Sequence, residues 1–298
     1  MSRRGWALFS VMAVLWGIPY LLIRVAVRQL DPGVLVLGRT APAALLLLPL
    51  VLARRQFSEI RENWRWIFTF GAVEIGGPWY FMATSERHIT SSLTSLLICV
   101  VPLFSVLGQR IRRTEDHVTP RRLTGLAVGA LGVALLVGLG ITGGSVQWIL
   151  MMLAVCLGYT LGPIILATKL QHASGTAVVA GATAFVALGW IPWSVTHWPS
   201  HVNAETWSSV AVLSIACTAV AFLVFFELIK EVGATRSVVV TYVNTALAVV
   251  LGIMLLREPL TVGIALGFPL VLVGSVLATS SRDSASAVLP RHADHALD

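Results

Sequence analysis

The feature that most constrains this chain is a succession of apolar runs, each close to the length of a membrane span, separated by short connections. A helix needs roughly 20 mostly apolar residues to cross the hydrocarbon core of a bilayer. By that criterion the sequence predicts an all-α integral membrane protein. Its ten predicted spans are residues 6–26, 33–53, 64–84, 89–109, 122–140, 146–168, 176–195, 207–229, 237–256 and 261–280. Since most connections are short, successive spans are expected to be antiparallel neighbours in one bundle.

A soluble fold is excluded by composition. Hydrophobic residues make up 56% of the 298 residues and charged residues 12%, against roughly 45–50% and about 25% in soluble domains. The stretch Trp6–Val25 is too long for the apolar core of a signal peptide and is followed by no small-residue cleavage site. It is therefore expected to be the first span. The polar tail 282–298 is predicted to be disordered and cytoplasmic.

The basic residues test the number of spans. If the N-terminus is cytoplasmic and the loops alternate, 16 of the 21 Lys and Arg residues fall on the inside and only Arg24, Arg28, Arg87 and Arg257 on the outside. Membrane proteins keep Lys and Arg in their short cytoplasmic loops. This distribution predicts ten spans in the plasma membrane with both termini cytoplasmic. It also explains the net charge of +7 without nucleic-acid binding, for which no basic-aromatic module is present.

Two halves of the chain resemble each other. When Glu258 is aligned with Glu115, a Thr and two glycines follow at matching distances if one residue is inserted: Thr261, Gly267 and Gly274 against Thr119, Gly125 and Gly132. The predicted units are residues 1–144 and 145–281, with five spans each. Because five is odd, the second unit would enter the membrane inverted, as in many secondary transporters. Two such units can enclose a shared polar chamber and rock around it.

These motifs resemble those of the EamA-type drug/metabolite transporter family. The resemblance rests on Leu-Arg-Glu-Pro-Leu-Thr at 256–261 with its later glycines, on Leu-Trp-Gly at 15–17, and on Pro32 followed by Arg39. It covers about residues 6–280 and implies ten helices in two inverted repeats of five. Members of the family mostly export metabolites, amino acids or drugs. The chain departs from the family where Asn244-Thr245 replaces a usual proline, although Pro102 is kept in the first repeat. An Arg-rich loop also replaces the first repeat's Gly-Glu ending.

Glu74 is the sharpest single candidate for a functional residue, because an ionisable side chain in mid-span is costly and rarely lacks a role. At about 1.5 Å per residue, Arg39 lies within about one helical turn of it in depth. Two interpretations follow. Glu74 is a proton-linked or cation-recognising carboxylate that Arg39 contacts only during part of the cycle, or the two form a permanent structural ion pair.

Aromatic side chains within the spans are candidates for a cavity that holds flat, amphipathic or cationic cargo. The alternative for each is a lipid-facing or interfacial position. The candidates are Trp16, Tyr20, Trp79, Tyr80, Tyr159, Phe222, Phe226 and Tyr242. Asn244, with Thr241 and Thr245, is a weaker candidate for cargo contact, since hydrogen bonds between helices explain it equally well.

Several other motifs have ordinary structural explanations. The spacings Gly158-x-x-x-Gly162 and Gly125-x-x-x-Gly129 favour close packing within the bundle over a homodimer seam. Glu258 and Glu115 are interpreted as surface pairs or helix caps. Pro199 between His197 and His201 argues against a metal site. The three cysteines lie in apolar runs and are expected to be small buried residues: Cys99, Cys156 and Cys217.

The predicted function is therefore a secondary transporter without cofactor that works by alternating access, driven by an ion gradient such as protons or by facilitated flux. The family resemblance implies export of small metabolites, such as amino acids or related amphipathic compounds, or of drugs. No phosphate-binding loop is present, so direct ATP drive is not expected. The alternatives are an intramembrane enzyme and a non-transporting scaffold. An enzyme would need a nucleophile, base or metal group at membrane depth, and the sequence shows no G-x-S-x-G or H-E-x-x-H motif.

Overall fold

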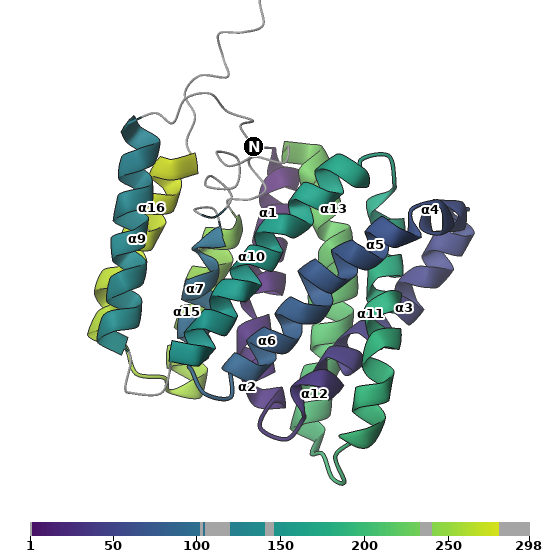
Figure 1. Cartoon of the computed structure of the whole chain (residues 1–298), viewed down its shortest axis with the longest axis horizontal. Helices are drawn as coiled ribbons and strands as arrows, with labels where there is room; N and C mark the ends of the chain where they lie inside the picture. The colour runs from purple at the N-terminus through teal and green to yellow at the C-terminus, as the bar shows by residue number, and fades with distance from the viewer. Residues whose placement is uncertain (1, 102–103, 105–119, 141–145, 233–239, 280–298) are drawn as a thin grey trace, which may run out of the picture.

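The computed structural model describes residues 2–101, 104, 120–140, 146–232 and 240–279, and every regular element in these residues is helical (Figure 1). In the first half the elements are α1 (Arg3–Gly17), α2 (Pro19–Ala26), α3 (Pro32–Ala53), α4 (Phe57–Glu62), α5 (Trp64–Phe70), η1 (Gly71–Gly76), α6 (Gly77–Ser85), α7 (Ser91–Ile98) and α9 (Pro120–Gly140). In the second half they are α10 (Val146–Lys169), α11 (Gly175–Thr196), α12 (Ala204–Ser214), η2 (Ile215–Val220), α13 (Ala221–Val232), α15 (Val240–Leu256) and α16 (Val262–Thr279).

The helices agree with a multi-pass membrane protein. Within the described residues, five segments are long and apolar enough to cross a bilayer, and shorter apolar helices cover 123–135, 240–256 and 262–274. The five long segments are Arg3–Ala26, Pro32–Ala53, Val146–Lys169, Gly175–Thr196 and Ala204–Val232. One predicted span differs: α7 ends at Ile98, about halfway along the expected 89–109, and most of the remaining residues of that span lie outside the described part. The predicted tail 282–298 and Glu115 also lie outside it.

Short polar side chains and prolines set the ends of these helices. Asp31 accepts a hydrogen bond from the Gly33 N–H at the start of α3, and Ser174 and Asn203 cap α11 and α12 in the same way. Such caps satisfy N–H groups that have no partner within the helix. Pro19 coincides with the break between α1 and α2, because its ring removes one hydrogen bond from the ladder.

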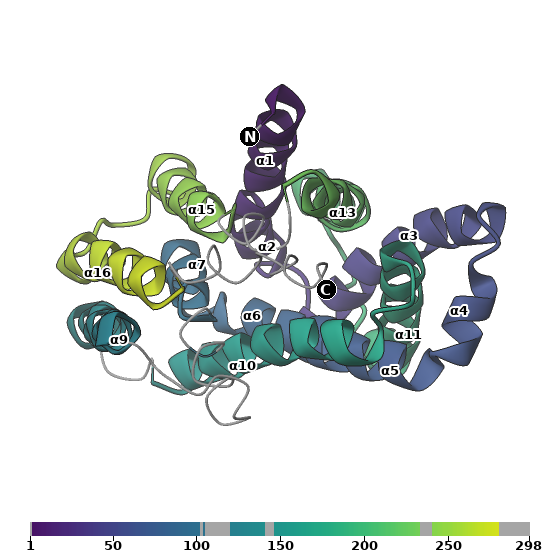
Figure 2. The same cartoon turned by 90° about the horizontal axis from the view of Figure 1, so that it is seen from above.

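The most extensive contacts join the two halves of the chain. Helix α3 packs on α11, α10 on α6, α1 on both α13 and α15, and α7 on α15 (Figure 2). Helices α9 and α16 stand side by side at one edge of the bundle in both Figures 1 and 2. Each half therefore buries its apolar surface mainly against the other half.

Glycines allow the closest of these contacts. A Cβ on Gly132 would lie 2.7 Å from the Val271 nitrogen and 2.9 Å from the Gly267 carbonyl oxygen, and one on Gly274 would meet the backbone of Gly129 and Gly125. The glycines that revealed the repeat thus form the crossing of α9 and α16. The prediction that the Gly125/Gly129 spacing serves packing within the bundle is confirmed.

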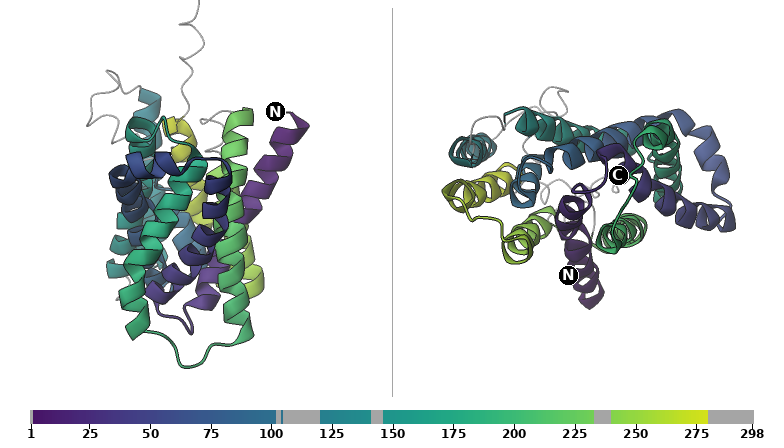
Figure 3. Two further views of the ribbon diagram at one scale, coloured as in Figure 1. Left: turned by 90° about the vertical axis from the view of Figure 1, so that its right-hand side faces the viewer. Right: turned by 90° about the horizontal axis from the view of Figure 1, so that it is seen from below.

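Hydrogen bonds join the halves at both ends of the bundle. At the end that carries Arg3, α1 slants outward beside α13 (Figure 3), and the Ser2 hydroxyl donates to Glu231 at 2.5 Å. At the opposite end, the Gln29 side chain accepts from the Asn203 N–H at 2.9 Å, and the Trp193 indole donates to Asp31 at 2.8 Å. At each end of the bundle, hydrogen bonds therefore join segments that are far apart in the sequence.

Candidate functional site

Two π-helical turns mark the middle of the bundle. They are η1 in the rod α5–η1–α6 and η2 in the rod α12–η2–α13, and they begin at positions 71 and 215. In η1, Pro78 has no N–H to donate to the Glu74 carbonyl, so the regular α-helical ladder is interrupted there. In η2, the Thr218 hydroxyl donates to the Leu213 carbonyl five residues earlier, at 2.8 Å. Single π turns inside helices occur frequently at functional sites.

The Arg39 side chain extends from α3 to both of these rods, α5–η1–α6 and α12–η2–α13. Its side chain is only 7% exposed. The Nε group donates to the Thr218 hydroxyl at 3.0 Å, and the guanidinium carbon lies 3.5 Å above the centre of the Trp79 ring. A guanidinium over an indole face is held by the ring quadrupole. Neither contact neutralises the positive charge.

Glu74 lies in η1 where α10 crosses it. The atoms nearest to a Cβ placed on Gly162 all belong to the Glu74 side chain, with Cδ at 2.7 Å and Oε2 nearer still. Gly158, one turn earlier, leaves room for the Val73 carbonyl and for Pro78. The Gly158/Gly162 spacing is therefore used inside the bundle, as predicted. Buried Oε2 accepts no hydrogen bond from any described residue.

The permanent ion pair, which was one of the two interpretations of Glu74 and Arg39, is not formed. Within the described residues the ion pairs join Glu227 to Arg4 and to Lys230, all at the surface. Arg39 instead satisfies its buried charge with an aromatic face and a hydroxyl, and Glu74 lies against a glycine. The structural interpretation of the pair is corrected on this point.

Tyr159 lies near both charged residues. It projects from α10, interacts electrostatically with both Glu74 and Arg39, and also contacts Trp79. Tyr20, buried in α2, interacts with Tyr159 in turn. The structure therefore brings five of the predicted site residues into one central group: Arg39, Glu74, Trp79, Tyr159 and Tyr20.

Other predicted aromatic residues lie outside this group. Trp16 packs against Phe222 and Phe225, with ring centroids 6.2 and 4.7 Å apart, between α1 and α13. Phe226 continues that aromatic row, 6.4 Å from Phe222. Tyr80 stacks on Trp190 of α11 at 4.8 Å. Its ring therefore serves the packing of α6 on α11.

Asn244 and Tyr242 are placed by α15. Asn244 is 4% exposed and accepts from Thr245 at 3.4 Å, while the Thr245 hydroxyl also reaches the Ser95 carbonyl of α7 at 3.4 Å. The bond from Thr245 to Ser95 agrees with the interpretation of Thr245 as a link between helices, whereas the bond to Asn244 lies within α15. Tyr242 is half-buried against the larger hydrophobic core.

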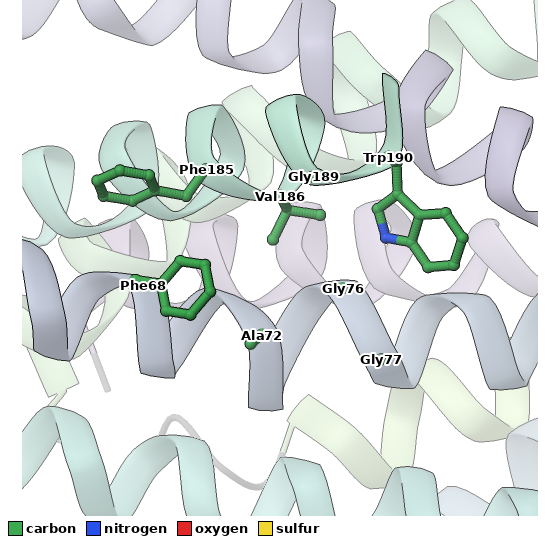
Figure 4. A pocket seen from close by; sticks show the side chains of 8 residues that line it. All are labelled: Phe68, Ala72, Gly76, Gly77, Phe185, Val186, Gly189 and Trp190. Carbon is green, nitrogen blue, oxygen red and sulfur yellow. The ribbon is translucent and has the colours of Figure 1, made fainter. Parts of the chain in front are cut away.

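A groove of about 220 Å³ lies between the rod α5–η1–α6 and α11 (Figure 4). Its walls are glycines and apolar or aromatic side chains, with no charged residue: Phe68, Ala72, Gly76, Gly77, Phe185, Val186, Gly189 and Trp190. Neither Arg39 nor Glu74 lines it. The groove therefore differs from the polar chamber that the sequence predicts.

The structure makes two residues prominent that were not predicted, Thr218 and Glu86, and it decides between the two interpretations of Glu258. Thr218 gave no signal by itself, although it lies 144 residues after Glu74, close to the spacing of the repeat. Glu86, for which no role was predicted, is fully buried. Glu258 was interpreted as a surface pair or a helix cap; it is 9% exposed and its carboxylate caps α7, accepting from the main chain and hydroxyls of Ser91 and Ser92 at 2.6–3.0 Å.

Comparison with known proteins agrees with this fold. The chain is 22% identical over 289 residues to the uncharacterized transporter YvbV of Bacillus subtilis, covering 93% of this chain and 92% of YvbV. It is 22% identical over 284 residues to an uncharacterized transporter of Archaeoglobus fulgidus, covering 94% and 100% of the two chains. The uncharacterized inner membrane transporter YedA of Escherichia coli is 23% identical, with 86% and 83% covered. A solved crystal structure superposes with a TM-score of 0.67 at 18% identity, covering 92% of this chain and 96% of the other, and so shares the fold.

An all-helical multi-pass bundle with charged residues at its centre defines the class as a membrane transporter. The sequence profile of the EamA-like transporter family matches the chain twice, at residues 3–138 and 146–280. The chain belongs to the EamA-like transporter family.

Proposed function

We propose that this protein is a secondary transporter that exports small amphipathic metabolites, amino acids or related compounds, or drugs, across the plasma membrane by alternating access. The observation that carries the proposal is the central group around Arg39 and Glu74. A buried charge at membrane depth costs about 2.5–3.5 kcal/mol on insertion scales. Such residues are rare unless they serve a substrate or an ion.

Each of the two charged residues has a separate role. The guanidinium of Arg39 has no acidic partner among the described residues, and Thr218 and Trp79 hold it in one orientation. A planar guanidinium binds a carboxylate through two parallel hydrogen bonds. Arg39 therefore recognises the carboxylate of the cargo. Glu74, with an unpartnered oxygen, receives either a proton or the cargo's amine, and the neighbouring aromatic rings accommodate its apolar part.

Three observations support two inverted five-helix repeats, residues 1–144 and 145–281. The family profile matches twice, and the two matches lie on either side of position 144. The π turns lie 144 residues apart in the third rod of each half. Contacts between the halves also occur in related pairs. Helix α1 begins the first half and packs on α13 of the second, and α10 begins the second half and packs on α6 of the first. Helices α6 and α13 correspond to each other, because each directly follows the π turn of its half. Halves related in this way rock around a shared site in other secondary transporters.

The distribution of basic residues orients the bundle. The start of α1, the end of α3 and the end of α10 lie at the same end of the bundle (Figure 1), and the basic residues at these helix ends are Arg3, Arg4, Arg54, Arg55 and Lys169. By the positive-inside rule this end is cytoplasmic. The end with the connections 27–31, 86–90 and 197–203 is accordingly the outer end.

The test is efflux from proteoliposomes loaded with a panel of amino acids, amines and dyes, with and without a pH gradient. Glu74→Gln is expected to remove the stimulation by the pH gradient, because the amide cannot carry the proton. Arg39→Leu is expected to abolish transport of carboxylate-bearing cargo, because no other described residue at the centre carries a positive charge.

Two exposed residues supply matched controls. Glu205→Gln and Arg28→Leu make the same chemical changes at the outer surface and should transport like the wild type. Unchanged flux and pH response in Glu74→Gln would exclude its role in coupling. Normal transport of carboxylate cargo by Arg39→Leu would remove Arg39 from the mechanism.

A further inference from the structure

Glu86 is a buried acid that the proposed mechanism does not use. It follows the last residue of α6 at the outer end, and none of its surface is exposed. Neither carboxylate oxygen accepts a hydrogen bond from any residue that the structure describes. Buried polar groups are almost always hydrogen-bonded, so this carboxyl group needs an explanation.

The charged and titratable groups around Glu86 come from several elements. Arg24 of α2, Glu258 of the α15–α16 connection and Arg39 of α3 interact with it electrostatically, as does Tyr20 of α2. The nearest cation does not pair with its carboxylate. Arg24 donates through Nη1 to the main-chain carbonyls of Glu86 and Ile89 instead, and Glu258 adds a second acid to the same region.

This environment favours the neutral, protonated form of the Glu86 side chain. A carboxylate removed from water loses its hydration, and here no ion pair or hydrogen bond within the described residues replaces it. The nearby Glu258 side chain accepts four hydrogen bonds, from the main-chain N–H groups and hydroxyls of Ser91 and Ser92. Of the two acids, only Glu86 has a carboxyl group that accepts no hydrogen bond from a described residue.

Hydrogen bonds hold together the connections at the outer end, where Glu86 is buried. Arg87 donates to the Leu30 carbonyl at 2.8 Å and so ties the α6–α7 connection to the α2–α3 connection. Glu258 ties the α15–α16 connection to the start of α7. Gln29 and Asn203 join the remaining connections. If these contacts separate, water reaches Glu86, and an ionised carboxylate is no longer penalised.

We propose that Glu86 is a second proton-binding site, which takes up a proton when the outer end closes and releases it when the outer end opens. Closure then buries a neutral acid, whereas closure over the ionised form would bury an uncompensated charge. Protons therefore favour the closed outer end, and raising the pH favours its opening. The proposal rests on the alternating-access part of the proposed function but requires no particular cargo.

The experiment measures the outer end directly, without cargo. Spin labels are placed on cysteines introduced at exposed Arg28 and Leu260, one in each half, while the three native cysteines are buried. Distances between the labels are recorded in lipid nanodiscs from acidic to alkaline pH. The variants are wild type, Glu86→Gln, Glu86→Asp and the exposed control Glu205→Gln. Infrared difference spectra of the same samples detect the C=O stretch of protonated carboxyl groups.

The wild type and Glu205→Gln are expected to shift toward longer distances as the pH rises. Glu86→Gln, which mimics the protonated acid in size and charge, should keep the short distance throughout and lose one protonated-carboxyl band. Glu86→Asp should restore a pH-dependent shift, which shows that the position tolerates substitution. An equal shift in wild type and Glu86→Gln, or an infrared spectrum in which Glu86→Gln keeps every protonated-carboxyl band of the wild type, overturns the proposal.

Failure of the transport proposal would look different. If no member of the cargo panel moves but the distances and the infrared band respond as expected, the Glu86 site stands and the cargo assignment falls. If cargo moves and Glu86→Gln still follows pH like the wild type, the Glu86 site falls alone.

Discussion

Gly162 determines the position of the Glu74 carboxylate at the crossing of α10 and η1. Alanine at this position would place a Cβ on the carboxylate itself. Overpacking of this kind typically costs about 1–3 kcal/mol. Gly162→Ala is therefore expected to lower efflux strongly and to reduce the thermal stability of the detergent-solubilised protein.

Gly189 is the matched control, because a Cβ there would find no atom within 4 Å. Gly189→Ala should leave efflux unchanged and, given the higher helix propensity of alanine, should not lower stability. Equal effects of the two substitutions would show that Glu74 does not depend on the space beside it.

Thr218 holds Arg39 in the orientation proposed for cargo binding. Thr218→Val keeps the shape of the side chain but removes the acceptor of the Arg39 Nε bond and the donor to Leu213. Loss of this hydrogen bond is expected to weaken cargo binding by about 1.5 kcal/mol. KM for carboxylate cargo should therefore rise about tenfold, with little change in kcat.

Thr218→Ser retains the hydroxyl and should restore a KM close to that of the wild type. Initial rates of efflux over a range of internal cargo concentrations separate KM from kcat. A Thr218→Val protein with unaltered KM would mean that Trp79 alone is sufficient to orient Arg39.

At the scale of elements, the cap on α7 is the most specific contact between the halves. Glu258 accepts bonds from two main-chain N–H groups and two hydroxyls, and Gly252 leaves room for them, since a Cβ there would lie 2.6 Å from Oε2. A carboxylate at a helix start also interacts favourably with the helix dipole. Glu258→Gln puts an amide nitrogen against these donors.

The variant Glu258→Gln should therefore lose about 1.5–3 kcal/mol of stability, visible as a lower denaturant midpoint in detergent. Glu205→Gln, an exposed acid in the first turn of α12, should shift the midpoint little. In Ser91→Ala/Ser92→Ala the effect of Glu258→Gln should shrink, because two of the four donors are gone. An undiminished effect in that background would place the origin of the loss elsewhere.

The elements themselves could be predicted from hydropathy because each span has to bury its backbone in lipid as a helix. The predicted spans 33–53 and 146–168 differ from α3 and α10 by one residue at most at each end. The π turns could not be predicted, since they depend on Pro78 in one rod and on a hydroxyl bond in the other. The partners of Arg39 were also inaccessible, because Thr218 lies 179 residues away in the chain. The positions of Arg39 and Glu74 in their predicted spans indicated that the two lie at similar depth in the membrane. Which groups contact the Arg39 guanidinium depends instead on how α3 packs on α6 and η2.

At the scale of the whole molecule, the inverted repeat makes a prediction about topology. Gln29 lies in the connection between α2 and α3, and His172 lies at the equivalent position between α10 and α11, 143 residues later, which is also the spacing between Glu115 and Glu258. Arg55 and Trp198 form a second pair with the same spacing. All four side chains are exposed, and in each pair the two residues lie at opposite ends of the bundle.

Single cysteines at these four positions, in a chain whose native cysteines are replaced by alanine, should react with a membrane-impermeant maleimide from opposite sides. Gln29→Cys and Trp198→Cys should label from outside intact cells, and His172→Cys and Arg55→Cys only after the membrane is permeabilised. The chain without introduced cysteines is the control for background. A repeat that entered the membrane in the same direction would put both members of a pair on one side. Labelling of Gln29→Cys and His172→Cys from the same side would therefore exclude the inverted architecture, and with it the rocking of two halves around Arg39 and Glu74.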